Sequence, residues 1–217
     1  MCTLYSLTKG QAAIIALAKA MKDHAGNLPS LPAIYPDFTA PVVRQTDKGR
    51  ELIKMRWGFP SPPIYGGRPV VNVRNAKSNY WKPWLKPEYR CLVPATSFCE
   101  YTDKINPKTK RKTPTWFALS DKRPIFFFAG IWRPWKGTRG TKADPVEGDH
   151  LLYSFLTTDP DKVVKTVHTK AMPVILTTAQ ERETWLTASI ADALKLQRPL
   201  QDKLLTIFAT GERKDEA

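Results

Sequence analysis

The feature that most constrains the fold is a succession of short apolar and aromatic segments, punctuated by Gly and Pro, from Ala40 to about Trp132. Val, Ile, Phe, Tyr and Trp favour pleated strands over helices. The pattern predicts strands at Ala40–Gln45, Leu52–Trp57, Pro69–Arg74, Arg90–Tyr101, Thr113–Leu119 and Ile125–Trp132. Because short turns connect antiparallel strands, we expect a curved, mainly antiparallel sheet or barrel.

Helix signals lie outside this region. Cap residues predict four helices, starting at Thr8 with Gln11, at Asp159-Pro160 with an end near His168, at Thr178 with Glu181, and at Ser189 with Asp192. We expect Gly26 to end the first helix, and the proline-rich stretch Leu28–Pro41 and the segment Gly137–Asp149 to form loops. The fold class is therefore α+β, with peripheral helices on one domain. The charged tail 211–217 is expected to be disordered.

The charge of the chain indicates a polyanionic partner. The net charge is +14 and the isoelectric point is near 9.8. From Arg44 to Arg90 eleven Lys or Arg face three acidic residues, and Thr102–Lys112 adds five more cations in an expected hairpin loop. This balance favours nucleic acid over a merely solvated surface, but it does not distinguish DNA from RNA.

Several protein classes are disfavoured. No apolar run approaches the roughly 18 residues of a membrane span. Three cysteines in 217 residues argue against a disulfide framework and for a reducing compartment. Cys91 and Cys99 lack zinc-site spacing and the chain has only three His, so we expect no metal and no cofactor.

Cys2 follows the initiator methionine. If Met1 is removed, Cys2 carries a free α-amine beside its thiol, and this 1,2-aminothiol condenses with an aldehyde to an imine and then closes to a thiazolidine. Ring closure is intramolecular and therefore strongly favoured. The amine and thiol titrate at roughly 8 and 8.5, close enough to neutrality for reaction. An inert residue on a frayed terminus is the alternative.

An ordered set of motifs resembles the SRAP (SOS response-associated peptidase) family. The matching segments are Met1-Cys2, Pro32–Val43, Arg56-Trp57-Gly58 with Pro60, Asn72–Ser78, Arg90–Glu100, Phe128–Trp132, Phe155–Thr158, and His168 with Met172–Leu176. They run in the family's order over about residues 2 to 178. The resemblance implies an SRAP-like domain over residues 1–210 that forms covalent crosslinks with abasic sites in single-stranded DNA.

The resemblance implies four catalytic positions. Cys2 is the expected nucleophile and Asn75, a neutral amide, is expected to orient it. Glu100, with Phe98, Cys99 and Tyr101 beside it, is expected to be partly desolvated and to move a proton at the sugar ring oxygen. His168 suits proton transfer near neutral pH. Without the resemblance, Asn75 is more simply interpreted as a turn residue, Glu100 as a surface glutamate and His168 as a histidine at the end of a helix.

Contacts with DNA are expected from residues around these positions. Arg74 and Lys77 flank Asn75 and are the first candidates for phosphate contacts, followed by Arg44, Arg56 and Arg90. Trp57 is the candidate for stacking on a base. His24 and His150 are expected to be structural.

The chain departs from the family pattern in three places. Thr3, Leu4 and Tyr5 follow Cys2, where the family commonly has Gly-Arg. The stretch from His168 to Pro173 is one residue longer than the family's His-Asp-Arg-Met-Pro and lacks its Asp, so a carboxylate that orients His168 must come from elsewhere. Lys77 replaces an Arg and loses the bidentate fork.

Three functions are therefore compared. The first is an abasic-site sensor that forms a Cys2 thiazolidine, with lyase activity as a side reaction. The second is a cysteine-type peptidase, most simply one that removes its own Met1, and the third is a non-catalytic nucleic-acid-binding module. For the abasic-site sensor we expect a cytoplasmic, nucleoid-associated monomer that binds single-stranded DNA with abasic sites. We expect no association with a membrane.

Overall fold

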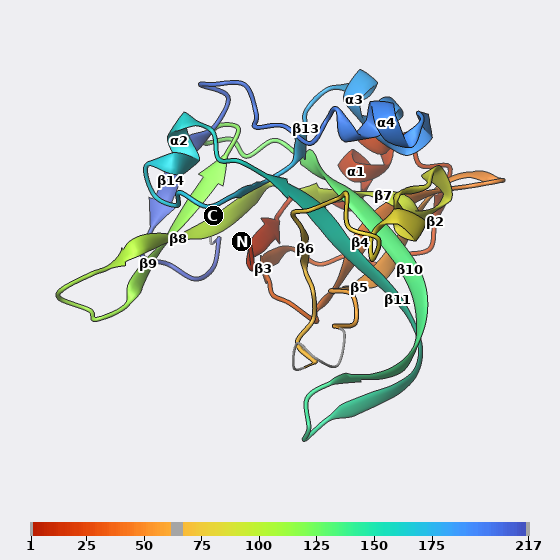
Figure 1. The fold of residues 1–217 in the computed structure, drawn as a ribbon, viewed down its shortest axis with the longest axis horizontal. Coiled ribbons are helices and arrows are strands. Elements are labelled where there is room, and N and C mark those ends of the chain that lie inside the picture. Colours follow the sequence, from red (N-terminus) through yellow and green to blue (C-terminus); the bar gives the residue numbers. More distant parts are fainter. Residues whose placement is uncertain (1, 62–66, 216–217) are drawn as a thin grey trace.

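The computed structural model describes residues 2–61 and 67–215 (Figure 1). The larger sheet contains β2 (Lys22–Asp23), β4 (Thr39–Thr46), β5 (Gly49–Trp57), β6 (Asn72–Val73), β7 (Arg90–Ala95), β10 (Phe126–Gly140), β11 (Pro145–Thr158), β12 (Met172–Pro173) and β13 (Ile175–Leu176). The smaller sheet has the order β14 (Thr206–Thr210), β9 (Lys112–Ala118), β8 (Ser97–Ile105), β1 (Tyr5–Leu7) and β3 (Leu31–Ile34).

Short helices lie at the periphery of these sheets. They are α1 (Gln11–Ala18), α2 (Lys162–Lys165), α3 (Ala179–Thr187), α4 (Ile190–Leu194) and the 3₁₀ turns η2 (Lys82–Leu85) and η3 (Pro87–Tyr89). Most strand pairs are antiparallel, as expected, and the parallel exceptions are β2–β5, β5–β11 and β6–β11. The predicted α+β class with a curved, mainly antiparallel sheet is confirmed. None of the helices in the described part is long and apolar enough to cross a membrane.

A cluster of aromatic rings joins the two sheets. Tyr5 of β1 meets Trp57 and Phe128 edge-on, with ring centroids 5.1 and 5.6 Å apart. Its hydroxyl lies 2.5 Å from that of Tyr153, so the buried polar ends of the two rings satisfy each other. All four side chains are fully buried. Aromatic packing therefore fixes the strand that follows Cys2 against the larger sheet.

The segment Arg90–Tyr101 is two strands where the sequence predicted one. β7 belongs to the larger sheet and pairs with β10, whereas β8 belongs to the smaller sheet and pairs with β1 and β9. Thr96 lies between them at a bend. Both halves are buried, so the hydrophobic pattern runs on without a break while the chain changes sheets.

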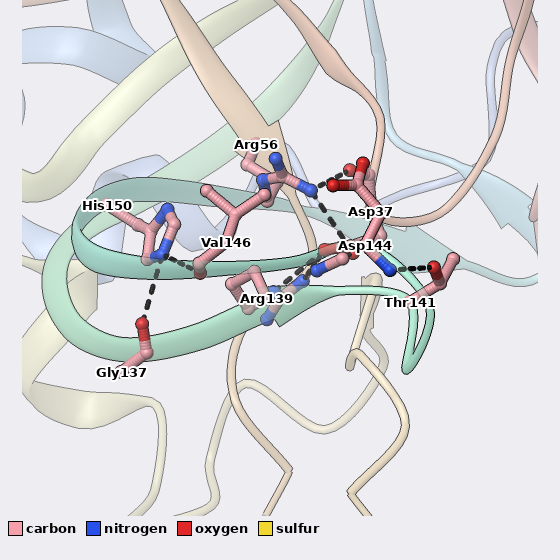
Figure 2. Close-up of polar contacts among 9 residues, drawn as sticks. Asp37, Arg56, Gly137, Arg139, Thr141, Asp144, Val146 and His150 are labelled. Atoms are coloured by element: carbon pink, nitrogen blue, oxygen red, sulfur yellow. Dashed lines mark hydrogen bonds and ion pairs between the residues drawn. The ribbon is translucent and has the colours of Figure 1, made fainter.

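The β10–β11 hairpin forms a long arm that projects from the body (Figure 1). Its pairing runs from Gly130↔Phe155 to Gly140↔Pro145, so most of the predicted loop at 137–149 is strand. His150 has the structural role that we expected, because its ring lies 3.1 Å from the carbonyl oxygens of Gly137 and Val146 (Figure 2).

Asp37 holds this arm against the body (Figure 2). Its carboxylate accepts hydrogen bonds from the Arg139 guanidinium at 2.7 Å, from the Gly140 backbone at 2.9 Å and from Arg56 of β5 at 3.2 Å. A hollow of about 450 Å³ lies beside this contact, between the arm and the segments around Pro36, Pro60 and Pro69.

The N-terminal region differs from the prediction in its caps. Gly10, without a side-chain bond, caps α1, and the helix stops at Lys19 in the left-handed region, well before Gly26. Thr8 instead pairs with the Thr96 hydroxyl at 3.2 Å. The expected loop 28–41 contains β3, because β1 offers it a free edge. His24 lies beyond the helix, 3.5 Å from Glu51.

The C-terminal helices begin as predicted. Thr178 and Glu181 form a reciprocal capping box on α3, and Ser189 caps α4. The tail that we expected to be disordered is instead placed as far as Asp215, which is buried and hydrogen-bonded to Ser6 and Ser97. The hydrogen bonds from these two hydroxyls to the buried Asp215 carboxylate hold the segment in place. The number of charged residues in the tail does not reveal such bonds. Residues 216–217 lie outside the described residues, as does Met1.

Candidate functional site

Cys2 lies three residues before β1, between the two sheets, and is fully buried. Its thiol is 3.4 Å from the Leu4 carbonyl oxygen, to which it donates. Burial, followed by the nearby charge of Glu100, raises the pKa of the Cys2 thiol well above its ordinary value. The thiol is therefore neutral and needs a base to accept its proton when it reacts.

Glu100 and His168 face each other beside Cys2. Glu100 of β8 is 2% exposed, and its Oε2 lies 3.7 Å from Nε2 of His168, which follows α2. Burial raises the pKa of Glu100 to about 8, and burial also lowers the pKa of His168. The distance between the two groups is that of an ion pair, but both pKa shifts favour the uncharged forms near neutral pH. The pair is therefore a neutral carboxylic acid beside a neutral imidazole.

Asp103 orients this histidine. Its Oδ1 lies 3.4 Å from His168 Nδ1, and its Oδ2 accepts bonds from the Thr169 backbone at 2.9 Å and the Thr169 hydroxyl at 2.6 Å. These bonds from Thr169 hold the pKa of Asp103 below its usual range. The segment after His168 lacks the Asp of the family pattern, and Asp103 supplies a carboxylate beside His168 in its place. The sequence did not predict this residue.

The amide that contacts Cys2 belongs to Asn72, not to the predicted Asn75. Asn72 of β6 is buried and its Nδ2 donates to the Cys2 carbonyl oxygen at 2.8 Å. Asn75 is exposed, and its side-chain oxygen accepts the Lys77 backbone N–H at 3.2 Å, as in a local turn. Both asparagines stand in the same motif, but Asn72 lies in the buried strand β6 and Asn75 lies in the exposed turn that follows it.

Gly58 sets the path of the chain that brings Asn72 to Cys2. Its φ of 116° lies in the left-handed region, and a side chain there would meet Pro69 at 2.4 Å. The turn lets Phe59 pair with Val70 and returns the chain into β6. A glycine is therefore required directly after Trp57.

Two predicted phosphate ligands are on the surface. Arg74 and Lys77 are exposed, and Arg74 forms an ion pair with the exposed Asp159. A surface pair of this kind contributes little to stability, so a phosphate group can replace Asp159 at small cost.

Trp57 and Arg90 do not fit the predicted contacts with DNA. Trp57 is fully buried, stacked on Phe155 at 5.2 Å, and its indole N–H donates to the Val71 carbonyl. Arg90 is 1% exposed and donates to the carbonyls of Leu85, Trp185 and Ala188. Both predictions are wrong for this conformation, because neither side chain reaches a surface that a strand can touch.

Arg44 and Arg56 are also engaged within the protein. Arg44 donates to Glu51 at 2.5 Å and covers the Trp132 ring, with 4.4 Å to its centroid. Arg56 donates to the carboxylate and the backbone carbonyl of Asp37. These contacts support the strands, and they leave the two arginines weaker candidates for DNA contacts than Arg74 and Lys77.

The site combines a thiol, a neutral carboxylic acid and a neutral imidazole around one buried point. Asn72 Oδ1 and Glu100 Oε1 are buried without a hydrogen-bond partner in the described structure. Buried polar atoms are normally paired, so these two acceptors beside the nucleophile have hydrogen-bonding capacity that a bound molecule can use. Among residues 2–61 and 67–215, no three His, Cys, Asp or Glu cluster as metal ligands.

Comparisons with known proteins agree with this fold. A family model described as SOS response associated peptidase (SRAP) matches residues 1–212. A crystal structure of a protein from Bacteroides thetaiotaomicron superposes with a TM-score of 0.72 at 22% identity, covering 95% of this chain and 91% of that one. The crystal structure of a phage-related protein from Bordetella bronchiseptica gives 0.67 at 20% identity, covering 95% and 93%. No match was found among curated proteins.

Proposed function

Because this chain belongs to the SOS response-associated peptidase (SRAP) family, which ties it to the response to DNA damage, we propose that it captures abasic sites in single-stranded DNA. The covalent bond forms through Cys2 once Met1 has been removed. The observation that carries the proposal is the placement of Cys2 against Asn72 and the neutral Glu100–His168 pair. The family resemblance seen in the sequence is confirmed.

The first step opens the sugar. An abasic deoxyribose exists mostly as a cyclic hemiacetal, so a proton must reach the ring oxygen while another leaves the C1′ hydroxyl. A protonated Glu100 is a donor for the first transfer and a neutral His168 an acceptor for the second. The open-chain aldehyde results, with no net change in protons.

The second step forms the bond. The Cys2 amine adds to the aldehyde and water leaves, giving an imine. The thiol then adds to the imine carbon, its proton passes to the nitrogen, and a thiazolidine ring closes. Asn72 holds the Cys2 carbonyl and so limits the orientations of the amine and thiol. The imine also acidifies the neighbouring carbon, so elimination of the 3′ phosphate is a lyase side reaction that ring closure suppresses.

Two exposed basic surfaces provide contacts for the strand. Arg74 and Lys77 lie on one, after β6. The other is the tip of the β8–β9 hairpin, which projects from the body at the left of Figure 1. Its exposed cations are Lys104, Lys108, Lys110, Arg111 and Lys112. Positive charge of this density suits a phosphate backbone better than a peptide substrate.

The test is incubation of the protein with a single-stranded oligonucleotide that carries one abasic site, followed by a denaturing gel. Intact mass is measured first to confirm that the chain begins at Cys2. We expect a denaturant-resistant band for wild type and for Cys99→Ala, the matched thiol control, and none for Cys2→Ala. Cys2→Ser keeps the amine and is expected to form the imine and cleave the strand without a lasting crosslink.

The remaining candidates give different results in the same experiment. A non-catalytic module binds in a salt-dependent manner and is indifferent to Cys2→Ala. A peptidase that removes its own Met1 starts at Cys2 in wild type but retains Met1 when Glu100 or His168 is replaced. A chain confirmed to begin at Cys2 that forms no crosslink overturns the proposal.

A further inference from the structure

The strand β1, which begins three residues after Cys2, and the strand β8, which carries Glu100, have little backbone pairing with each other. β1 is three residues long, and its register with β8 consists of Tyr5↔Phe98 and Ser6↔Ser97. Two flanking backbone bonds, from Thr96 to Ser6 and from Cys99 to Leu4, complete the contact. The relative position of Cys2 and Glu100 therefore needs support from outside this ladder.

Residues 211–215, which we call the strap, supply a crossing contact. After β14 the strap leaves β9 and runs to β3, the opposite edge of the smaller sheet. Gly211 donates to Pro114 at 2.8 Å, and the Glu212 carbonyl accepts the Trp116 indole N–H at 2.9 Å. At the far edge Asp215 donates its backbone N–H to Pro32 at 2.9 Å.

The strap ends in a buried carboxylate placed on the β1–β8 pair. Asp215 is 2% exposed, and its Oδ2 accepts hydrogen bonds from Ser6 at 2.5 Å and Ser97 at 2.7 Å. The two hydroxyls are themselves 2.6 Å apart. Arg123 forms an ion pair with the other oxygen, Oδ1. Bonds to a charged acceptor are about twice as strong as neutral ones, so this carboxylate clamps the two strands together.

Strand geometry separates the clamp from the site itself. Side chains alternate along β8, so Ser97 and Cys99 point to the strap side while Phe98 and Glu100 point to the other. Leu4, Cys99 and Trp116 accordingly form their own small core, apart from the large cluster that contains Phe98. Asp215 therefore affects Glu100 and Cys2 only through the strands.

We propose that Asp215 is a positioning residue for the Cys2 site: by tying Ser6 to Ser97 it fixes β1 against β8 and so sets the spacing of Cys2 and Glu100. The functional part of this inference rests on the proposed crosslinking activity. The structural part does not, because the burial of Glu100 is measurable without any reaction.

The test compares Asp215→Asn with Asp202→Asn, which removes an exposed carboxylate paired with Lys162. The side-chain titration of Glu100 is followed by ¹³C NMR in labelled protein, assigned with Glu100→Gln. The crosslinking rate constant at saturating abasic oligonucleotide is measured beside it. Ser97→Ala removes one bond of the clamp and is the second variant if Asp215→Asn does not fold.

In the folded variant we expect water to reach Glu100 more easily, so its titration midpoint falls by about one unit from the wild-type value. The rate constant is expected to fall roughly tenfold, because small displacements of reacting groups are costly. Asp202→Asn changes neither quantity. A Glu100 midpoint in Asp215→Asn that equals the wild-type value overturns the inference. A wild-type chain that forms no crosslink overturns the proposed function, and the NMR titration then tests the role of Asp215 by itself.

Discussion

Glu100 carries its carboxyl group where the charged form is unfavourable. Its pKa of about 8, raised by burial, exceeds that of an unfolded chain. A group whose pKa is raised on folding contributes stability that is fully present below its unfolded pKa and is lost as the pH rises through its folded pKa. For Glu100 this window extends from roughly pH 4.3 to pH 8.

Glu100→Gln is therefore expected to leave stability unchanged near pH 4 and to raise it at pH 8, because the amide resembles the protonated acid. The gain at pH 8 should exceed about 1.4 kcal/mol, the equivalent of one pKa unit. Denaturant unfolding across this pH range measures it. Glu88→Gln, at an exposed position, is the control, and a gain that does not vary with pH contradicts the assigned burial.

Asn72 and Asn75 provide a matched pair. Asn72→Ala leaves the buried Cys2 carbonyl without its donor, so we expect a loss of about 1–3 kcal/mol in the free energy of unfolding. The crosslinking rate is expected to fall roughly tenfold. Asn75→Ala removes only a surface turn contact and should change stability by less than about 0.5 kcal/mol. The reverse order of effects would favour Asn75 as the catalytic amide.

The sequence predicted Cys2, Glu100 and His168, which the structure brings together, but it did not predict the contacts with Asn72 and Asp103. Asn72 and Asn75 are three residues apart in one motif, and only the pairing of β6 with β11 decides which one faces Cys2. Asp103 was not predicted because the β8–β9 register shifts between Tyr101 and Ile105. This shift breaks the alternation of inward and outward side chains that a strand pattern in the sequence assumes. Burial of Trp57 and Arg90 depends on long-range packing in the same way.

The β10–β11 arm depends on one carboxylate for its attachment. Asp37→Ala leaves the guanidinium of Arg139, which is 8% exposed, without its partner. We expect a loss of about 1–3 kcal/mol and faster amide hydrogen exchange over residues 134–150. Asp144→Ala, at an exposed position in the same arm, should change neither. Unchanged exchange in Asp37→Ala would show that pairing alone holds the arm.

Elements with local signals were predicted and those that depend on tertiary pairing were not. Capping residues identified α3 and α4, and apolar runs located β4, β5 and β9. The division of Arg90–Tyr101 between two sheets was missed because burial of both halves gives one continuous pattern. The length of the arm was missed because Gly and Pro in its strands resemble turn signals.

The exposed cations of the molecule predict how binding to DNA depends on salt. Lys108→Ala with Lys110→Ala removes two exposed cations from the β8–β9 tip. For single strands each lost phosphate contact lowers the slope of log affinity against log salt by about 0.7, so the double variant should lose about 1.4. Fluorescence anisotropy with an intact oligonucleotide measures this without any crosslinking.

Lys162→Ala with Lys195→Ala is the matched control, because it removes the same charge from exposed lysines that pair with Asp202 and Asp192. Its slope should stay closer to that of wild type. Equal losses in the two double variants would mean that net charge, and not the β8–β9 tip, governs binding.

The strap also orders events during synthesis. The smaller sheet combines strands from residues 5–34, 97–118 and 206–210, so it cannot be completed until almost the whole chain has left the ribosome. Until residues 206–215 have emerged, β1 lacks the Asp215 carboxylate that Ser6 binds, and we expect the segment around Cys2 to stay open to the enzymes that trim nascent chains. Under the proposed function, Met1 would be removed before Cys2 is buried, and the reactive terminus would be enclosed only after it had been made.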